Sequence, residues 1–169
     1  GARIRRIRED HKELGQCEGI GLVVPGMVDA TGACISFAPR LGWRDFPLRD
    51  LLARETGLPV HIENSGRACA IAQVWGVRRE VGRSSAFVFL SVSDGLGVGF
   101  VVNGKVVRGR HNVAGEFGHV PLNVDGPPCA CGAAGCWEAY VSNLATLSRY
   151  FGREISPRKP IPVEIASFT

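Results

Sequence analysis

Short apolar segments alternate with amphipathic segments along much of this chain. Residues 19–25 form an almost wholly apolar run between turn residues, which is typical of a buried strand in a parallel or mixed sheet. Residues 60–63 predict a second short strand, and residues 85–92 predict a stronger one. Residues 95–108 are edged by glycines and predict a hairpin whose tight turn is Asn103-Gly104.

Helical periodicity occupies the segments between these strands. Residues 2–14 place their apolar side chains on one face, as expected of a surface helix. Leucines form the buried stripe of a second helix, which starts at Pro47 and stops at Gly57. Residues 65–76 and 137–150 predict two further helices. Because strand and helix patterns alternate, we predict an α/β fold.

A polar and basic segment at residues 77–84 interrupts the pattern. We place a boundary there, so that residues 1–79 form part of a first α/β subdomain and residues 80–169 form part of a second. The second part contains a turn-rich stretch, residues 112–136, in which three cysteines gather. This stretch is where we expect a metal loop.

Composition and charge narrow the class of protein. Hydrophobic residues make up 45% and charged residues 21% of the chain, an ordinary globular mixture. A net charge of +4 is too modest for a DNA-binding surface. No apolar run reaches the ~20 residues that span a membrane, and the charged N-terminal segment does not resemble a secretory signal. We therefore expect a cytoplasmic protein without a membrane span.

Glycine and cysteine are placed in an informative way. The chain has 22 glycines among 169 residues, well above the usual ~7%, and many lie in tight turns between apolar runs. This placement indicates strands that fold closely around something. Cys17, Cys34 and Cys69 are scattered among apolar segments and predict small core residues.

The other three cysteines suggest a metal site. Cys129, Cys131 and Cys136 lie on one glycine-bent loop, and the nearest candidate for a fourth ligand is His119. Three thiolates and an imidazole suit a tetrahedral zinc ion, and four protein ligands would make the site structural. An iron–sulfur cluster, which prefers four cysteines, is an alternative. A second alternative is that the cysteines are reduced and bind no metal.

Motifs around these cysteines resemble those of one family. Gly115-Glu116-Phe117-Gly118-His119, followed by a Cys-x-Cys-Gly-x-x-Gly-Cys-Trp-Glu segment that ends at Glu138, resembles the signature of the ROK family of repressors, open reading frames and sugar kinases. Residues 25–29, 38–43 and 63–65 resemble the family's PG-x-VD, aPNL-x-W and E-N-D segments, and residues 95–99 resemble its second phosphate loop. The resemblance covers about residues 19–150.

This resemblance implies an actin-like, ribonuclease-H-like ATPase fold. Two α/β subdomains would surround a cleft that binds a sugar and, in the family's kinases, ATP. The family's N-terminal phosphate loop and C-terminal part do not occur in this sequence, nor does the winged helix-turn-helix of its repressors. We therefore expect the chain to be a central, incomplete piece of the fold.

The resemblance also implies a sugar pocket. Glu116 and Glu138 would supply carboxylates for paired hydroxyls, and Asn64 would supply an amide. His119 would bind zinc through one ring nitrogen and face a sugar hydroxyl with the other, so that the metal fixes the ring. The zinc loop would thereby position both His119 and Glu138. The carboxylate of Glu138 also suits a helix N-terminus for electrostatic reasons.

Three positions depart from the pattern of the family's kinases. Ser65 stands where they carry the aspartate that takes a proton from the attacking hydroxyl, and serine has no useful basicity near neutrality. Its other expected role is to cap the helix at residues 65–76. Arg40 replaces an asparagine, and either points into solvent or selects an acidic or phosphorylated ligand. Asp94 replaces a threonine, and its carboxylate would repel a nucleotide.

Together these features favour a sugar-sensing transcriptional regulator that has lost the kinase base, and we predict that it is not an enzyme. The alternative is an ATP-dependent sugar kinase like the family's glucokinases. A zinc-stabilised sugar-binding protein without regulatory output is a third hypothesis. For the regulator we expect a small sugar effector, a homo-oligomer, and DNA contact only through a helix-turn-helix outside this chain.

Overall fold

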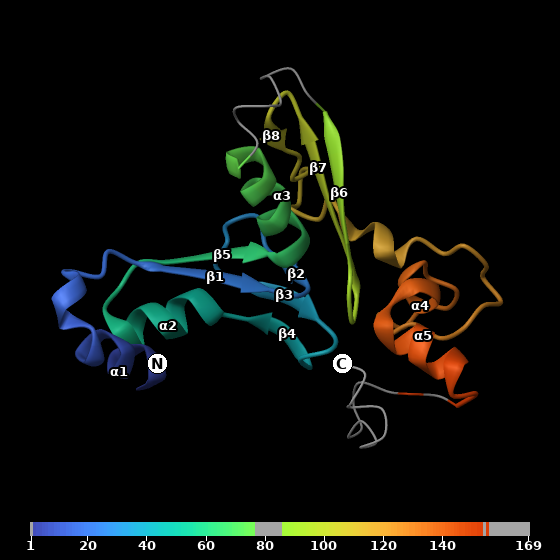
Figure 1. Cartoon of the computed structure of the whole chain (residues 1–169), viewed down its shortest axis with the longest axis horizontal. Helices are drawn as coiled ribbons and strands as arrows, with labels where there is room; N and C mark the ends of the chain where they lie inside the picture. Colours follow the sequence, from blue (N-terminus) through green and yellow to red (C-terminus); the bar gives the residue numbers. More distant parts are fainter. Residues whose placement is uncertain (1, 77–85, 154, 156–169) are drawn as a thin grey trace.

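The computed structural model describes residues 2–76, 86–153 and 155 (Figure 1). Within them, helix α3 (Ser65–Gly76) lies between two groups of elements and contacts strands of both groups. The boundary expected at residues 77–84 lies outside the described residues. Among the described residues, none of the helices combines the length and the apolar character that crossing a membrane requires.

The first group consists of two small sheets and two helices. Strand β1 (Ile20–Val24) pairs in parallel with β5 (Val60–Asn64). Strands β2 (Met27–Val28), β3 (Ile35–Ala38) and β4 (Trp43–Phe46) form an antiparallel sheet. Helix α2 (Leu48–Thr56) packs against β5, and α1 (Ala2–Asp10), followed by the short 3-10 helix η1 (Lys12–Leu14), lies beside α2 (Figure 1).

Apolar side chains from both sheets form the core of this group. Its buried members come from β1, β2, β3 and β5: Val24, Val28, Ile35, Ala38, Val60 and Ile62. The parallel pairing of β1 with β5 agrees with the parallel or mixed sheet predicted for residues 19–25. The expectation that β1 is fully buried is only partly right, since Val24 is buried but Val23 is 58% exposed.

The second group consists of a meander and an irregular, turn-rich segment. Strands β6 (Phe87–Val92), β7 (Leu96–Val102) and β8 (Lys105–Val106) pair antiparallel in that order. The 3-10 helix η2 (Glu116–His119) follows, then the cysteine segment, then α4 (Glu138–Val141) and α5 (Asn143–Tyr150). Asn103 and Gly104, both with positive φ, form the predicted tight turn between β7 and β8.

Glycines allow α3 to approach β7 closely. A Cβ at Gly99 would lie 2.5 Å from the Cβ of Ala70, and one at Gly66 would lie 2.9 Å from the backbone nitrogen of Val98. Neither contact is compatible with a larger side chain at those positions without movement of the backbone. Part of the glycine-rich sequence at residues 95–99 is therefore explained by helix–strand packing.

Several local expectations need correction. The antiparallel sheet β2–β3–β4 was not predicted, because its strands have only two to four residues. The helix expected at residues 137–150 is broken at Ser142, whose hydroxyl accepts a hydrogen bond from the backbone N–H of Ala145 and starts α5. Pro47 precedes α2 rather than opening it, whereas Gly57 ends α2 as expected, with φ 68°. Three cysteines predicted as core residues are only partly buried: Cys17, Cys34 and Cys69.

Candidate functional site

A cleft with a volume of about 430 Å³ brings the predicted sugar-binding residues together. Its wall contains the four side chains expected to hold a sugar, which are Asn64, Glu116, His119 and Glu138. The positions that depart from the kinase pattern lie in the same wall, and they are Arg40, Ser65 and Asp94. A second hollow of about 560 Å³ runs along α1 and η1 and contains none of these residues.

Glu138 is the most firmly held carboxylate of the cleft. It is buried at the first position of α4, and its Oε2 accepts a hydrogen bond of 2.9 Å from the backbone N–H of Leu96. Its Oε1 lies 3.2 Å from Nη2 of Arg40. Arg40 therefore does not simply point into solvent, which was one of the two expectations for it.

Asn64 has a structural role that the sequence analysis assigned to Ser65. Its side-chain oxygen accepts a hydrogen bond from the backbone N–H of Arg67 in the first turn of α3, and its amide nitrogen donates to the carbonyl oxygen of Gly26. Asn64 is thus the residue that caps α3, and the expected capping role of Ser65 is wrong. Ser65 is the first residue of α3 and lines the cleft.

Glu116 lies in an environment that disfavours its charged form. Burial raises the pKa of its carboxyl, the charges of His119 and Arg67 lower it, and the nearby Glu138 carboxylate raises it, with a net increase. The two carboxylates therefore differ: Glu138 has an ion pair with Arg40 and a hydrogen bond from a backbone N–H, whereas among the described residues Glu116 has neither kind of direct contact. Hydroxyl donors of a bound molecule would supply the missing compensation.

The metal ligands predicted from sequence converge at the edge of the same cleft. The ligand atoms of His119, Cys129, Cys131 and Cys136 all lie within 4.8 Å of one another. Nδ1 of His119 is 3.6 Å from Sγ of Cys129, and Sγ of Cys131 is 3.7 Å from Sγ of Cys136. The cysteines are free thiols.

The separations of 3.6 Å and 3.7 Å fit zinc, whereas the widest separation, up to 4.8 Å, would have to shorten when an ion binds. A tetrahedral ion with Zn–S bonds of about 2.3 Å and a Zn–N bond of about 2.1 Å requires S···S separations of about 3.8 Å and S···N separations of about 3.6 Å. Three sulfurs and one nitrogen suit zinc better than an iron–sulfur cluster. Burial and the neighbouring thiols of Cys131 and Cys129 raise the pKa of Cys136 to about 12, so a cation that binds here must displace protons.

The metal cluster is coupled to the cleft through His119. With Nδ1 turned toward Cys129, the ring leaves Nε2 as the second nitrogen, and His119 also lines the cleft. A metal at Nδ1 would fix the orientation of the ring and leave Nε2 as a hydrogen-bond donor. Cys136 is two residues before Glu138, so the same metal would also hold the start of α4.

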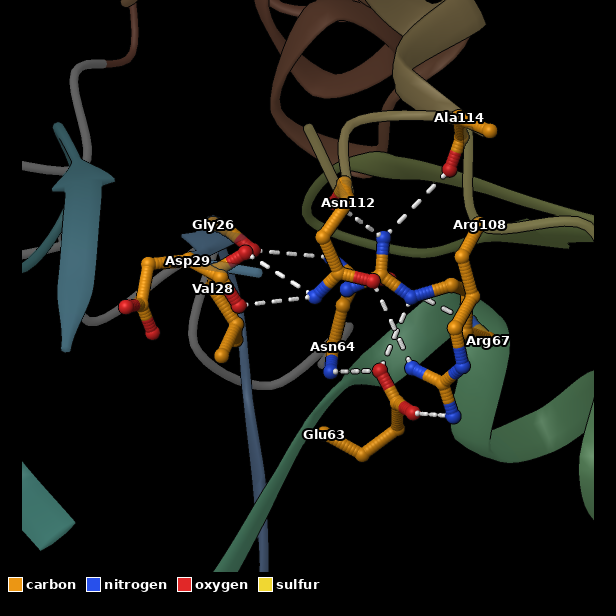
Figure 2. A network of polar contacts seen from close by, with 9 residues as sticks. All are labelled: Gly26, Val28, Asp29, Glu63, Asn64, Arg67, Arg108, Asn112 and Ala114. Atoms are coloured by element: carbon orange, nitrogen blue, oxygen red, sulfur yellow. Dashed lines mark hydrogen bonds and ion pairs between the residues drawn. The ribbon is translucent and has the colours of Figure 1, made fainter. Parts of the chain in front are cut away.

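A buried arginine that the sequence analysis missed fixes the segment leading to Glu116. Arg67 is fully buried, and its Nε donates to Oε1 of Glu63 at 2.8 Å (Figure 2). Its Nη1 donates to the carbonyl oxygens of Asn112, at 2.7 Å, and Ala114, at 3.4 Å. A charged residue within the small-residue segment of α3 was the one signal in the sequence that could have indicated this role.

The same network ties the two groups of elements together. Asn112 donates through Nδ2 to the carbonyl oxygens of Val28 and Asp29 in the first group, and Arg108 forms an ion pair with Glu63 (Figure 2). Burial raises the pKa of Glu63, but hydrogen bonds from both arginines and from the backbone lower it below its usual value. The network therefore keeps Glu63 ionised and away from the cleft.

Comparison with known proteins places the chain in context. The model of the ROK family matches residues 4–165. The xylose repressor of Caldicellulosiruptor bescii is 38% identical over 130 residues, which cover 77% of this chain and 32% of the repressor. A glucokinase of Halalkalibacterium halodurans is 35% identical over 139 residues, which cover 82% of this chain and 42% of the kinase.

Solved structures of a ROK kinase and of a ROK regulator are also similar to this chain. A ROK glucokinase from Streptomyces griseus, in complex with glucose and AMPPNP, matches with a TM-score of 0.75 at 36% identity, over 88% of this chain and 47% of its own. A ROK transcriptional regulator homologous to the Mlc protein of E. coli matches with a TM-score of 0.72 at 28% identity, over 96% of this chain and 42% of its own. The chain thus spans less than half the length of these relatives, with part of their actin-like ATPase fold. Since the family model matches nearly all of its residues, the chain belongs to the ROK family.

Proposed function

We propose that this chain is the effector-binding core of a sugar-sensing transcriptional regulator of the ROK family and has no kinase activity. The observation that carries the proposal is Ser65, which lines the cleft beside Asn64. The resemblance to the family's kinases implies that they carry their base at this position. Phosphoryl transfer to a sugar requires that the attacking hydroxyl lose its proton, and a serine hydroxyl cannot accept it near neutral pH.

Two other residues of the cleft also support the proposal that the protein is not a kinase. Arg40 forms an ion pair with Glu138, and the family resemblance implies a smaller, neutral asparagine at this position in the kinases. Asp94 lies in the wall next to the glycine-rich start of β7, where its negative charge disfavours nucleotide phosphates. Glu63 does not replace the base, because both of its oxygens are held by arginines.

In this proposal the sugar contacts Asn64, Glu116, His119 and Glu138, and a structural zinc ion held by His119, Cys129, Cys131 and Cys136 keeps two of these contacts in place. The bound metal supplies geometry and a fixed imidazole tautomer. The full-length protein is a cytoplasmic homo-oligomer that contacts DNA through a helix-turn-helix outside residues 1–169. Sugar binding shifts the balance between two arrangements of the protein, and it can do so only if the sugar binds them with different affinities.

The first test is a kinase assay on the full-length protein with ATP, magnesium and a panel of hexoses, pentoses and amino sugars. We expect no turnover above background, because a positioned base contributes ~10²–10⁴-fold. We also expect Ser65→Asp to restore little, since Arg40 and Asp94 remain. A ROK glucokinase assayed beside it is the positive control. Turnover of about 1 s⁻¹ or more, the lower end of ordinary kinases, would contradict the proposal.

A second prediction concerns Glu138→Ala. Loss of this carboxylate should weaken binding of glucose or xylose, whichever binds, by about tenfold to a hundredfold, because a hydrogen bond to a charged group contributes about 1.5–3 kcal/mol. Isothermal titration calorimetry measures the affinity, and Asp125→Ala, at an exposed position outside the cleft wall, is the control. Unchanged affinity in Glu138→Ala would place this residue outside the sugar site.

The second candidate function is an ATP-dependent sugar kinase, and the match to ROK glucokinases favours it. In that case Glu116, whose pKa is raised by burial, is the cleft carboxylate best suited to accept a proton. Turnover that is lost in Glu116→Gln would support the kinase. Release of DNA from the full-length protein on addition of xylose or glucose, without turnover, would support the regulator and exclude a sugar-binding protein without output.

A further inference from the structure

An ion pair crosses the cleft between residues 98 positions apart in the sequence. Arg40 lies in the turn between β3 and β4, and Glu138 begins α4, beyond the cysteine segment. The Nη2···Oε1 distance is 3.2 Å, and the two side chains are 23% and 11% exposed. An ion pair at this depth is screened less by water and salt than a surface pair.

This pair uses the remaining acceptor oxygen of Glu138. Its Oε2 accepts the Leu96 N–H and packs over Gly95, where a Cβ would lie 2.8 Å from that oxygen. Its Oε1 faces Arg40, and among the described residues Glu138 is the one polar partner of that guanidinium. Arg40 thus occupies one of the two acceptor positions of Oε1, and a hydroxyl that approaches Oε1 from the same direction must take its place.

The charges of the cleft argue against an acidic or phosphorylated ligand. Its ionisable wall residues comprise the carboxylates of Asp94, Glu116 and Glu138 against one guanidinium, Arg40, and the imidazole of His119. The charge of Arg40 is already balanced by Glu138. A phosphate or carboxylate group would meet the two other acidic side chains without an uncompensated cation to receive it. A neutral polyhydroxyl ligand meets no such repulsion.

We propose that Arg40 is a specificity-determining residue that competes with the ligand for Glu138. In the free protein its guanidinium holds Oε1, and a neutral sugar binds only when a hydroxyl displaces it. The apparent affinity is then reduced by the fraction of molecules in which the pair is formed. Displacement also breaks the direct side-chain link between the β3–β4 turn and α4. This inference rests on the proposed function and identifies which class of sugar its site accepts.

The test is a titration of full-length wild-type protein, Arg40→Asn and Arg40→Lys with D-glucose and D-xylose. Arg40→Asn should bind the responsive sugar about two- to fivefold more tightly, because the competing pair is gone. Arg40→Lys, which keeps the charge on a shorter reach to Glu138, should fall between the two. Arg44→Asn is the matched control, since Arg44 stacks over Phe37 on the neighbouring strand and lies outside the cleft wall.

The dependence of sugar affinity on ionic strength distinguishes competition by Arg40 from a purely structural role of this residue. Raising salt from about 0.05 M to about 0.5 M shortens the Debye length and weakens the ion pair. Because the pair is only partly buried, salt still screens it in part, and the affinity of the wild-type protein for the neutral sugar should rise slightly with salt. The affinity of Arg40→Asn should stay constant. Equal salt dependence in both proteins would contradict competition.

Anionic analogues decide between competition and anion recognition. Glucose 6-phosphate and glucuronate should bind the wild-type protein more weakly than glucose does. Tighter binding of either, lost in Arg40→Asn, would overturn the inference and make Arg40 an anion-binding residue. If the wild-type protein binds sugar and Arg40→Asn binds it no more tightly, the competition is refuted but the proposed function is not. Absence of sugar binding in the wild-type protein and in both Arg40 variants refutes the proposed function, and the competition with it.

Discussion

Cys131→Ser should lose the bound metal and, with it, nearly all affinity for sugar. A serine hydroxyl does not replace a thiolate, and a structural zinc ion contributes about 10–16 kcal/mol to the folding of small zinc-dependent peptides. The segment from His119 to Glu138 contains few regular elements that could hold it without the metal. Since His119 and Glu138 would both lose their positions, we expect sugar affinity to fall by at least about a hundredfold.

Metal analysis and calorimetry on the same preparations measure this effect. Wild-type protein that has never met a chelator should contain one zinc ion per chain, and Cys131→Ser should contain nearly none. Hydrogen exchange should increase in residues 119–138 of the variant, because metal binding is coupled to local folding. Cys17→Ser, which lies outside the cluster, is the control and should keep both metal and affinity. Wild-type protein without zinc would rule out the metal site.

Regular elements with a clear period could be predicted from the sequence. The strands β1, β5 and β6, the β7–β8 turn, and the helices α2 and α3 lie where their patterns indicate. The sheet β2–β3–β4 could not be found in this way, since strands of two to four residues are too short to display alternation. Ser142 breaks the last helix through a local hydrogen bond that competes with the helical pattern.

The convergence of the candidate site residues on one cleft could be expected from the sequence, but the contacts between them could not. The family motifs identify Asn64, Glu116, His119 and Glu138, and all of them line one cleft. Motifs do not say which atoms are already engaged. That Arg40 reaches Glu138 depends on how the β3–β4 turn and α4 approach each other, which no local pattern encodes. The same holds for capping by Asn64, because Ser65 is an equally suitable residue by type.

Arg67→Met should destabilise the region around α3 more than any other single change outside the metal cluster. Methionine fills a similar volume without the charge, so Glu63 loses a buried partner, and the carbonyl oxygens of Asn112 and Ala114 lose their donor. Removing one member of a buried pair typically costs about 3–5 kcal/mol. At about 2–4 °C per kcal/mol, the melting temperature of this region should fall on the order of 10 °C.

Arg108→Met is the matched control, because Arg108 pairs with the same carboxylate but is 49% exposed. Exposed pairs contribute about 0.2–1 kcal/mol, so its melting temperature should fall by only a few degrees. Differential scanning calorimetry gives the melting temperatures, and hydrogen exchange over residues 112–116 reports whether the segment before Glu116 has loosened. If the two substitutions lower the melting temperature equally, the buried ion pair of Arg67 contributes no more stability than the exposed ion pair of Arg108.

Lowering the pH should reduce the difference in melting temperature between the wild-type protein and Arg67→Met. Burial alone would raise the pKa of Glu63, but Arg67 and then Arg108 lower it below its usual value of 4.5. A carboxyl with a lowered folded-state pKa contributes stability that is present above its unfolded value and lost as the pH falls through its folded value. The Arg67 contribution that depends on this charge should therefore be complete at about pH 6 and decline below about pH 4.5. A difference that stays constant over this range would assign the whole effect to the hydrogen bonds that Arg67 donates to the carbonyl oxygens of Asn112 and Ala114, and not to its ion pair.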